Sequence, residues 1–496
     1  MNAKKINRRK FLINSLEAAA GIGVLASCDK RTVVEPDIRL PAAPTGLSYN
    51  LATSDSGAVD SVMITWDRPL TDVTGAKLWT GIRAYDVYRD DTLLAQVTNP
   101  GFVDASGFAV GSTCAYTVRA VDSSPVTGPN GQMGNQSPPS DRLLVPIQKP
   151  SHVYPVTNAT VNTGTIGKPN IQATLLKSMI DAAVAQMQID NGAIPSGSTQ
   201  DPAVATAAWE SLFPGLTASS LIGIKVNTLG GSNVSTRPEV VTAIVSSLTA
   251  MLGGTFPAYQ IIIFDDRAPG SQMAAAGFPL RNVKGTSRIA SASFNTTLND
   301  GVPVSQQEPG SALWGSTVNI AGTDKRLTAI FEAVDFLINV PVLKDHAQSG
   351  ISFSMKNLYG ITDIWNGPAT LHDTMCSPSI PALYQAVRAI PNARTGASKL
   401  ALIVGDALQG CFSGGPDGPP TCQPNSIVVG TDPVAIDTWA LKTINALRAK
   451  YAPTLPEISW TQSTNPNQSD ARHILDAAIQ YNLGSTNFVS GKVSLV

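Results

Sequence analysis

The chain is short of charged residues. Only 14% of its 496 residues are Asp, Glu, Lys or Arg, against about 25% in an average soluble protein. The 35 basic and 36 acidic side chains nearly cancel and leave a formal net charge of −1 at pH 7. Such a balance creates no field that recruits nucleic acid or a membrane surface, so we expect no nucleic-acid partner.

Several motifs that identify common enzymes are missing as well. Without a C-x-x-C pair, a Cys-ligated iron–sulfur cluster or zinc finger is not indicated. No G-x-S-x-G segment is present, and no G-x-G-x-x-G follows a predicted strand. The sequence therefore indicates neither a common hydrolase nor a common dinucleotide-binding fold. Histidine is scarce too, yet two of the four residues, His346 and His372, fall close together. The other two, His152 and His473, are expected at the surface.

The N-terminus carries an export pattern. Arg8 and Arg9 precede a short apolar segment that ends in "LASC", where the last letter is Cys28. This order resembles a twin-arginine signal with a lipobox, in which the Cys becomes the lipidated first residue. The apolar segment is too short for a permanent span. We expect residues 1–28 to be the signal, residues 29–40 a tether, and the protein to be anchored on the periplasmic side of the cell envelope.

Four cysteines remain after the lipobox. Cys411 and Cys422 bracket the turn-rich segment "FSGGPDGPPT", which has neither helical nor strand periodicity. In an oxidising compartment this arrangement predicts a disulfide that closes the loop. Cys114 and Cys376 have no evident partner.

Residues 41–147 have the pattern of an all-β domain. In "SVMITW", for example, Val62, Ile64 and Trp66 share one face, and turn-forming clusters separate about seven such segments. The segments "APTGL", "ITWDRP", "YDVYRDD", "FVDAS" and "CAYTVRAVD" follow one another as in a fibronectin type III module, which this region resembles. The resemblance implies a β-sandwich that acts as a spacer or contacts a protein or polysaccharide.

Residues 148–496 alternate between strand-like and helix-like segments. Buried strands are predicted at "LIGIKVN", "YQIIIFDD", "FEAVDFLINVPVL" and "KLALIVGDA". Helices are predicted over 237–252 and 432–447, the second with Asp432 as N-cap and Pro433 in the first turn. This alternation predicts an α/β domain with a mostly parallel sheet. Residues 266–330 are less regular and read as an insertion or a β-rich flap.

Polar side chains gather where the predicted strands end. In open α/β sheets the ligand crevice lies at the carboxyl ends of the strands, so these side chains predict a site. The order of the strands is left open by the sequence. The residues at the four ends are Lys225 with Asn227, Asp265 with Asp266, Lys344 with Asp345 and His346, and Asp406.

The residue types indicate two kinds of ligand. Lys225, Lys344 and Lys356 would repel one another in one cleft unless an anion joined them, which favours a phosphate, carboxylate or sugar acid. A divalent metal held by histidine and aspartate is the alternative, and the cofactor therefore stays unassigned. His346 is a candidate acid/base or metal ligand because its side chain titrates near neutral pH.

A family resemblance points to the same residues. "IGIKVN", "FLINVPVLKDHAQSGISFSMKNLYG", "LIVGDAL" and "VVGTDPVAIDTWAL", in that order, resemble the domain of unknown function 362 family over about 150–455. The resemblance supports a site and assigns no reaction. We assign catalytic roles to His346, Lys344 and Asp406, substrate binding to Lys225, Asn227, Lys356 and Asn357, and metal binding to His372, Asp432 and Asp437.

Taken together, the sequence predicts an all-β fibronectin type III-like sandwich followed by an α/β domain. The leading functional hypothesis is an exported lipoprotein whose α/β domain has an anion-binding catalytic site, with or without a metal ion. The alternative is a lipoprotein that binds a ligand or partner without turning it over.

Overall fold

The structure is a computed structural model, and it describes most of the chain from residue 39 onward. The described residues are 39–53, 59–78, 80–125, 133–148, 150–265, 270–278, 288–291, 314–363, 371–372, 376–460 and 470–495. The predicted signal, tether and lipidated Cys28 lie outside these ranges, apart from the last two tether residues. No helix of the described residues is long and apolar enough to cross a membrane.

The N-terminal domain is built from two antiparallel sheets, as the sequence predicts. One sheet has the order β1-β2-β5 and the other has the order β4-β3-β6-β7, which is the arrangement of a fibronectin type III-like sandwich. The strands are β1 (Thr45–Thr53), β2 (Val59–Asp67), β3 (Ile82–Arg89), β4 (Thr92–Val97), β5 (Gly101–Asp104), β6 (Thr113–Asp122) and β7 (Leu143–Pro146).

Alternation along these strands makes the core of the sandwich. Val62, Ile64 and Trp66 of β2 are buried, whereas Met63 between them is exposed. The Trp66 ring meets the edge of Tyr85 from the facing sheet, with ring centroids 5.3 Å apart. The predicted inward face of this strand is therefore confirmed.

The second domain is a three-layer α/β fold around one large sheet. Its main strand order is β11-β10-β9-β14-β17-β18-β8-β19. Strands β11, β10, β9, β14 and β17 are parallel neighbours, and β18 runs antiparallel to β17 and β8. The strands are β8 (Ser151–Thr157), β9 (Ile222–Val226), β10 (Ile261–Asp265), β11 (Arg288–Ser291), β14 (Phe336–Val340), β15 (Val342–His346), β16 (Gly350–Ser352), β17 (Leu400–Cys411), β18 (Ser426–Gly430) and β19 (Phe488–Ser490).

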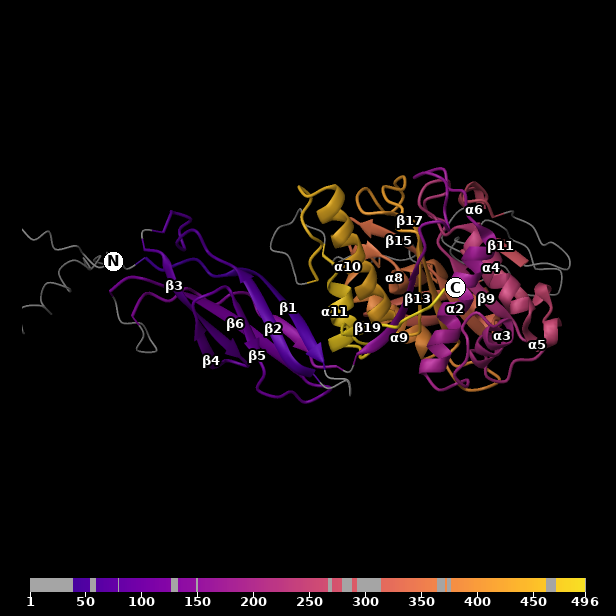
Figure 1. The fold of residues 1–496 in the computed structure, drawn as a ribbon, viewed down its shortest axis with the longest axis horizontal. Coiled ribbons are helices and arrows are strands. Elements are labelled where there is room, and N and C mark those ends of the chain that lie inside the picture. Colours follow the sequence, from indigo (N-terminus) through magenta and orange to yellow (C-terminus); the bar gives the residue numbers. More distant parts are fainter. Residues whose placement is uncertain are drawn as a thin grey trace, which may run out of the picture.

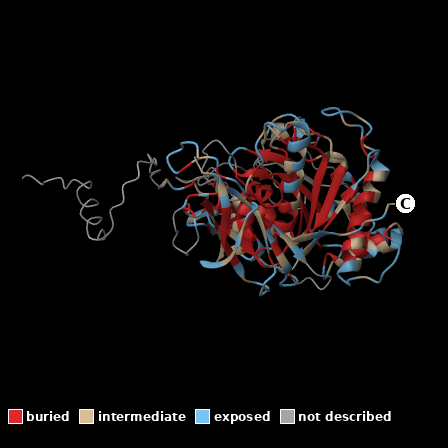
Figure 2. Ribbon diagram, turned by 60° about the vertical axis from the view of Figure 1, so that its left-hand side comes forward, coloured by how far each residue is buried: buried red, intermediate tan, exposed pale blue. Residues whose placement is uncertain are grey.

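Helices cover both faces of this sheet, so its central strands are buried throughout (Figures 1 and 2). One apolar cluster joins the sheet to α2, α3 and α4, and another joins it to α7 through α11. The helices are α2 (Ala173–Asp190), α3 (Pro202–Ser211), α4 (Pro238–Thr249), α5 (Met251–Gly254), α6 (Gly270–Ala275), α7 (Ala329–Ala333), α8 (Ser354–Asn357), α9 (Ser379–Arg388), α10 (Pro433–Tyr451) and α11 (Arg472–Ile479), with 3-10 turns η2 (Ala258–Gln260) and η3 (Leu358–Ile361).

Two predicted strands differ in detail. The segment predicted as one strand, "FEAVDFLINVPVL", contains the end of the short helix α7, strand β14 and the start of β15, with a break at Pro341. Proline lacks the N–H that a central strand needs, which explains the break. Strand β17 is longer than predicted and continues to Cys411, because its second half pairs with β15.

The segment predicted as an insertion is described only in pieces. It contains α6, β11 and an antiparallel hairpin of β12 (Trp314–Ile320) and β13 (Thr323–Thr328). The hairpin turns at Ala321 and Gly322, both with positive φ, as a two-residue primed turn requires.

The two domains touch through the C-terminal part of the chain. Strand β7 ends at Pro146 and β8 begins at Ser151, so little chain separates them. The Tyr49 ring of the sandwich stacks on Trp460, with centroids 5.5 Å apart, and its hydroxyl lies 3.1 Å from that of Thr486. Figure 1 shows the sandwich beside α10 and α11.

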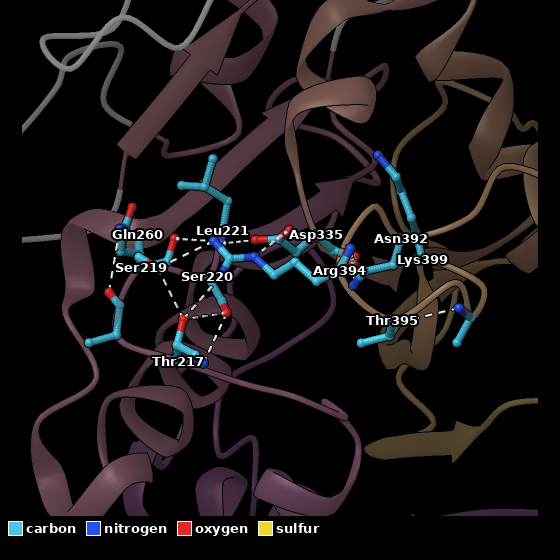
Figure 3. A network of polar contacts seen from close by, with 12 residues as sticks. Thr217, Ser219, Ser220, Leu221, Gln260, Asp335, Asn392, Arg394, Thr395 and Lys399 are labelled. Atoms are coloured by element: carbon cyan, nitrogen blue, oxygen red, sulfur yellow. Dashed lines mark hydrogen bonds and ion pairs between the residues drawn. The ribbon is translucent and has the colours of Figure 1, made fainter.

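A polar network ties together the N-terminal ends of the parallel strands (Figure 3). Arg394 donates from Nε to Asp335 Oδ1 at 3.1 Å and from Nη2 to the Ser219 hydroxyl at 3.2 Å. The other oxygen of Asp335 accepts from the Leu221 N–H at 2.8 Å. Because these residues precede β9, β14 and β17, the network stabilises the sheet edge opposite the predicted site.

Candidate functional site

The carboxyl ends of β9, β10 and β14 lie side by side, because these strands are neighbours in the sheet. The prediction that their polar ends meet is confirmed for Lys225, Asn227 and Asp265. A cavity of about 30 Å³ opens there, well below the roughly 300–1,000 Å³ of pockets for whole organic ligands. We call it the strand-end pocket. Its lining residues are Lys225, Asn227, Leu229, Asp265, His346, Ser352, Lys356, Asn357, Tyr359, Gly360 and Pro416.

Lys225 and Asp265 form a buried ion pair at the base of the pocket. The Lys225 ammonium donates to Asp265 Oδ1 at 3.0 Å, to the Val226 carbonyl at 2.7 Å and to Asn357 Oδ1 at 3.5 Å. The second oxygen of Asp265 accepts from the N–H and the hydroxyl of Thr228. Both charges are thus engaged within the protein, and their main effect is to hold the ends of β9 and β10 together.

A directed chain of hydrogen bonds orients three asparagines. Lys344 Nζ donates to Asn227 Oδ1 at 2.8 Å, and Asn227 Nδ2 donates to Asn357 Oδ1 at 3.1 Å. Asn357 Nδ2 then donates to Asn339 Oδ1 at 2.7 Å, and Asn339 Nδ2 donates to the Ser354 carbonyl at 2.8 Å. Each amide has one possible orientation in this chain, so the pocket wall is fixed before any ligand arrives.

Strand β15 sends its side chains alternately to two places. Lys344 and His346 point toward the site, as the two-residue spacing predicts, although Lys344 does not itself line the pocket. Asp345 faces the other way, where it accepts from the Gly415 N–H at 2.8 Å and from Arg448 at 3.2 Å. Lys344 therefore positions Asn227, and Asp345 anchors the loop after β17.

Lys356 and two aromatic rings form another part of the site. The Lys356 ammonium lies 4.5 Å from the centre of the Tyr359 ring and 3.4 Å from the Cys376 sulfur. His372 packs against Tyr359 edge to face, with centroids 5.4 Å apart, and stacks on His346 at 5.9 Å. The two histidines that the sequence brings close together are thus neighbours in space.

Asp437 holds the short helix that carries Lys356 and Asn357. Its two carboxylate oxygens accept from the N–H groups of Ser354 at 2.6 Å and Met355 at 3.1 Å, at the start of α8. Burial raises the pKa of the Asp437 carboxyl to about 7. This residue therefore acts on the site through α8.

His473, which the sequence places at the surface, is buried beside Asp437. Its Nε2 lies 4.0 Å from Asp437 Oδ2, and neither ring nitrogen has a hydrogen-bond partner among the described residues. Burial, followed by the nearby Lys356 ammonium, lowers the pKa of His473 to about 3. The surface prediction was wrong because α11 packs against α10, which periodicity alone does not reveal.

Asp406 lies in the middle of β17, away from the strand-end pocket. It accepts from the Arg237 N–H at 2.8 Å, where α4 begins, and from the Leu408 N–H at 3.0 Å. Burial raises the pKa of its carboxyl to about 6. Asp406 therefore holds the start of α4 through the Arg237 N–H. The sequence analysis placed Asp406 at a strand end, because the pattern of residues does not reveal that β17 continues beyond it and pairs with β15.

Asp432 caps α10, as predicted. Its carboxylate accepts from the N–H groups of Val434 at 2.8 Å and Ala435 at 2.9 Å, and also from the Ser151 hydroxyl and the Ser485 N–H. It lines a larger cavity, about 870 Å³, between the sandwich and the α/β domain. This larger cavity is a weaker candidate for the site. Both carboxylate oxygens of Asp432 already accept hydrogen bonds within the protein, and the other residues that line the cavity are mostly neutral.

The predicted metal ligands do not form one set. His372 stacks on His346, Asp437 supports α8 and Asp432 caps α10 at the domain boundary. Among the described residues, no three His, Cys, Asp or Glu side chains gather closely enough to hold a metal ion. The sequence grouped them by order along the chain, whereas helix α10 separates Asp432 from Asp437 by more than one turn.

The predicted disulfide is absent, since Cys411 and Cys422 are both free, buried thiols. Cys422 pairs with Gly410 across an antiparallel bridge, and a Cβ on Gly410 would lie 3.3 Å from the Cys422 sulfur. Cys411 is the next residue along and therefore points to the opposite face, where it packs against Val234 and Val342.

Comparison with known families identifies the domain that holds the pocket. Residues 222–442 match the domain of unknown function DUF362. This DUF362 domain contains β9, β10, β14 and α8, together with the asparagine chain. Most of the sheet and the whole strand-end pocket therefore fall inside it.

Other similarities cover small parts of the chain. Exoglucanase B from Cellulomonas fimi is 33% identical over 140 residues, which are 27% of this chain and 11% of that protein. The spore cortex lytic enzyme SleM of Clostridium perfringens and a fibronectin-III array of RIM-binding protein share 17% and 20% identity over 22% and 26% of this chain. The matched segments cover 28% of the SleM chain and 42% of the RIM-binding protein chain, each with a TM-score of 0.16. The assignment of the N-terminal domain as a sandwich therefore rests on the pairing of strands β1 to β7.

Asn339, Tyr359 and Gly360 are among the residues of the site that the sequence analysis missed. Asn339 is the one polar residue within "FLINV", and an amide inside an otherwise apolar strand was the available signal. Tyr359 and Gly360 stand in the quoted "NLYG" but received no role. A Cβ on Gly360 would lie 2.5 Å from Lys225 Nζ and 2.7 Å from Asp265 Oδ1, so a larger residue there would displace the ion pair.

Proposed function

We propose that the DUF362 domain binds a small anionic group at the strand-end pocket. The observation that carries this proposal is the composition of the wall, whose described residues include two ammonium groups, Lys225 and Lys356, and a single carboxylate, Asp265, with the His346 ring beside them. Both oxygens of that carboxylate are already engaged. The excess of positive charge in a buried site favours an anion, and the small volume favours a phosphate, a carboxylate or the acid group of a sugar.

Lys356 and His346 are the groups proposed to meet the anion, and Asn227 lies beside them. The Lys225 ammonium already donates to three oxygens, so it supplies charge and rigidity rather than a new contact.

Binding without turnover is a second candidate function for this pocket. It is favoured by the engagement of both members of the Lys225–Asp265 pair, which leaves neither poised for proton transfer.

The cellular setting is part of the proposal. The arginine pair, the apolar segment and "LASC" support export and lipidation at Cys28, which would place the DUF362 domain on the periplasmic side of the envelope. A Cys28→Ser variant that still fractionates with membranes would overturn the anchor. The sandwich is proposed to act as a spacer or as a contact for a protein or polysaccharide.

Calorimetry and thermal shift with phosphate, sulfate, acetate and glucuronate test the binding. We expect Lys356→Met to abolish the shift that the best anion produces in the wild type. Lys399→Met is the matched control, because Lys399 is also buried but donates to the Phe331 and Glu332 carbonyls at the opposite sheet edge. Equal anion affinity in the wild type and Lys356→Met would reject the proposal.

A further inference from the structure

His346 is held by the tight turn that joins β15 to β16. It ends β15 and pairs with Gly350, the first residue of β16. Gly350 has a φ of +68°, and a Cβ there would lie 2.8 Å from the Ala471 nitrogen, so the turn requires glycine. The turn folds back under the imidazole and directs two backbone N–H groups at it.

Those two groups decide which ring nitrogen carries the proton. The N–H groups of Gln348 and Ser349 lie 3.0 Å and 3.3 Å from His346 Nδ1. A backbone N–H can only donate, so Nδ1 must present a lone pair. A neutral imidazole has one donor and one acceptor nitrogen, so its proton is then on Nε2.

We propose that this turn holds His346 as the Nε2–H tautomer, so that it serves the strand-end pocket as a neutral hydrogen-bond donor to an oxygen of the bound anion. The donor role rests on the proposed anion binding, whereas the tautomer does not. The ring has little freedom to turn, because it lines the pocket while stacked on His372, with centroids 5.9 Å apart.

This assignment differs from the roles that the sequence favoured. A general base or a metal ligand acting through Nε2 needs a lone pair on that atom, which moves the proton to Nδ1. There it would face two N–H donors and leave both of them without their acceptor. The turn therefore selects hydrogen-bond donation over both earlier roles.

Nitrogen-15 NMR of histidine-labelled protein tests the tautomer directly. The chain has four histidines, so the signals that vanish in His346→Gln belong to His346. We expect a protonated Nε2 and an unprotonated Nδ1 at neutral pH. A proton on Nδ1, or a fully protonated ring, would overturn the assignment.

Phosphate binding by two variants tests the donor role. Glutamine carries an N–H donor near the position of Nε2 but cannot act as a base, so His346→Gln should bind phosphate within a few-fold of the wild type, while His346→Ala loses at least tenfold. The matched control is His152→Gln, which changes an exposed histidine on β8.

Equal losses of phosphate affinity in His346→Gln and His346→Ala would contradict the donor role. If the wild-type protein binds no phosphate, the proposed function and the donor role fail together, while NMR still decides the tautomer.

Discussion

The ammonium of Lys344 donates a 2.8 Å hydrogen bond to Oδ1 of Asn227, although 117 positions separate the two residues in the chain. This bond starts the asparagine chain that ends at the Ser354 carbonyl. It joins the residue that follows β9 to β15, and it gives Lys344 a positioning role behind the pocket wall. The interior of this site is therefore a set of fixed amides around a buried ion pair.

Replacing Gly360 by alanine should damage the site. The new Cβ would lie 2.5 Å from Lys225 Nζ and 2.7 Å from Asp265 Oδ1, and overpacking of this kind costs about 1–3 kcal/mol. We expect a lower melting temperature and weaker anion binding, measured by calorimetry. In the control Gly81→Ala the nearest atom lies 3.7 Å from the added Cβ. Unchanged anion affinity in Gly360→Ala would show that the Lys225–Asp265 ion pair has no part in anion binding.

Removal of Lys225 should be severely destabilising. Lys225→Ala leaves the buried Asp265 carboxylate without its cation, and breaking one side of a buried pair costs about 3–5 kcal/mol. Urea unfolding measures this loss. The partly exposed pair Arg237–Glu239 provides the comparison, where Glu239→Gln should cost less than about 1 kcal/mol. Similar losses in the two variants would contradict the buried pair.

The loss of Asn339 should loosen the asparagine chain. Asn339→Leu removes the acceptor of Asn357 Nδ2 and the donor to the Ser354 carbonyl, so Asn357 and Asn227 lose their fixed orientation. We expect weaker binding of the anion, measured by calorimetry, with a smaller change in melting temperature than for Lys225→Ala. Wild-type affinity in this variant would show that the chain of amides has no effect on the pocket.

The buried carboxyl of Asp406 should make stability depend on pH. Its folded-state pKa of about 6 lies above the ordinary 3.8, so between these values the folded protein keeps a proton that the unfolded chain has lost. The free energy of unfolding of the wild type relative to Asp406→Asn should therefore fall as pH rises from about 4 to about 6, and then level off. Urea unfolding at several pH values measures it, and an opposite slope would contradict the raised pKa.

Cys411 and Cys422 should react as buried thiols. Burial raises their pKa values to about 11 and about 12, so both should resist alkylation in the native protein and react after unfolding in urea. Mass spectrometry of non-reduced peptides counts the labels. A peptide pair linked through these two residues would instead restore the disulfide that the sequence favoured.

Much of the architecture was predictable because it depends on local patterns. Alternation in "SVMITW" predicted the sandwich, and continuous apolar runs predicted the buried parallel strands. Asp432 and Pro433 marked the start of α10 correctly. The strand ends at Lys225, Asn227 and Asp265 also meet as expected, because neighbouring parallel strands end at one edge of a sheet.

Other features of the site depended on contacts between distant segments. Asp406 of β17 anchors the start of α4 and does not line the pocket, because β17 extends along β15. His473 is buried because α11 packs on α10, and Cys411 and Cys422 point to opposite faces of one strand pairing.

By itself, the sequence determined the kinds of element and the edge of the sheet where charge collects, since periodicity and side-chain chemistry are local properties. Only the tertiary structure decided which polar groups are engaged with one another. Hydrogen bonds such as Lys344 to Asn227 join residues far apart in the chain, and the geometry of a tight turn, rather than any motif, places the proton of His346.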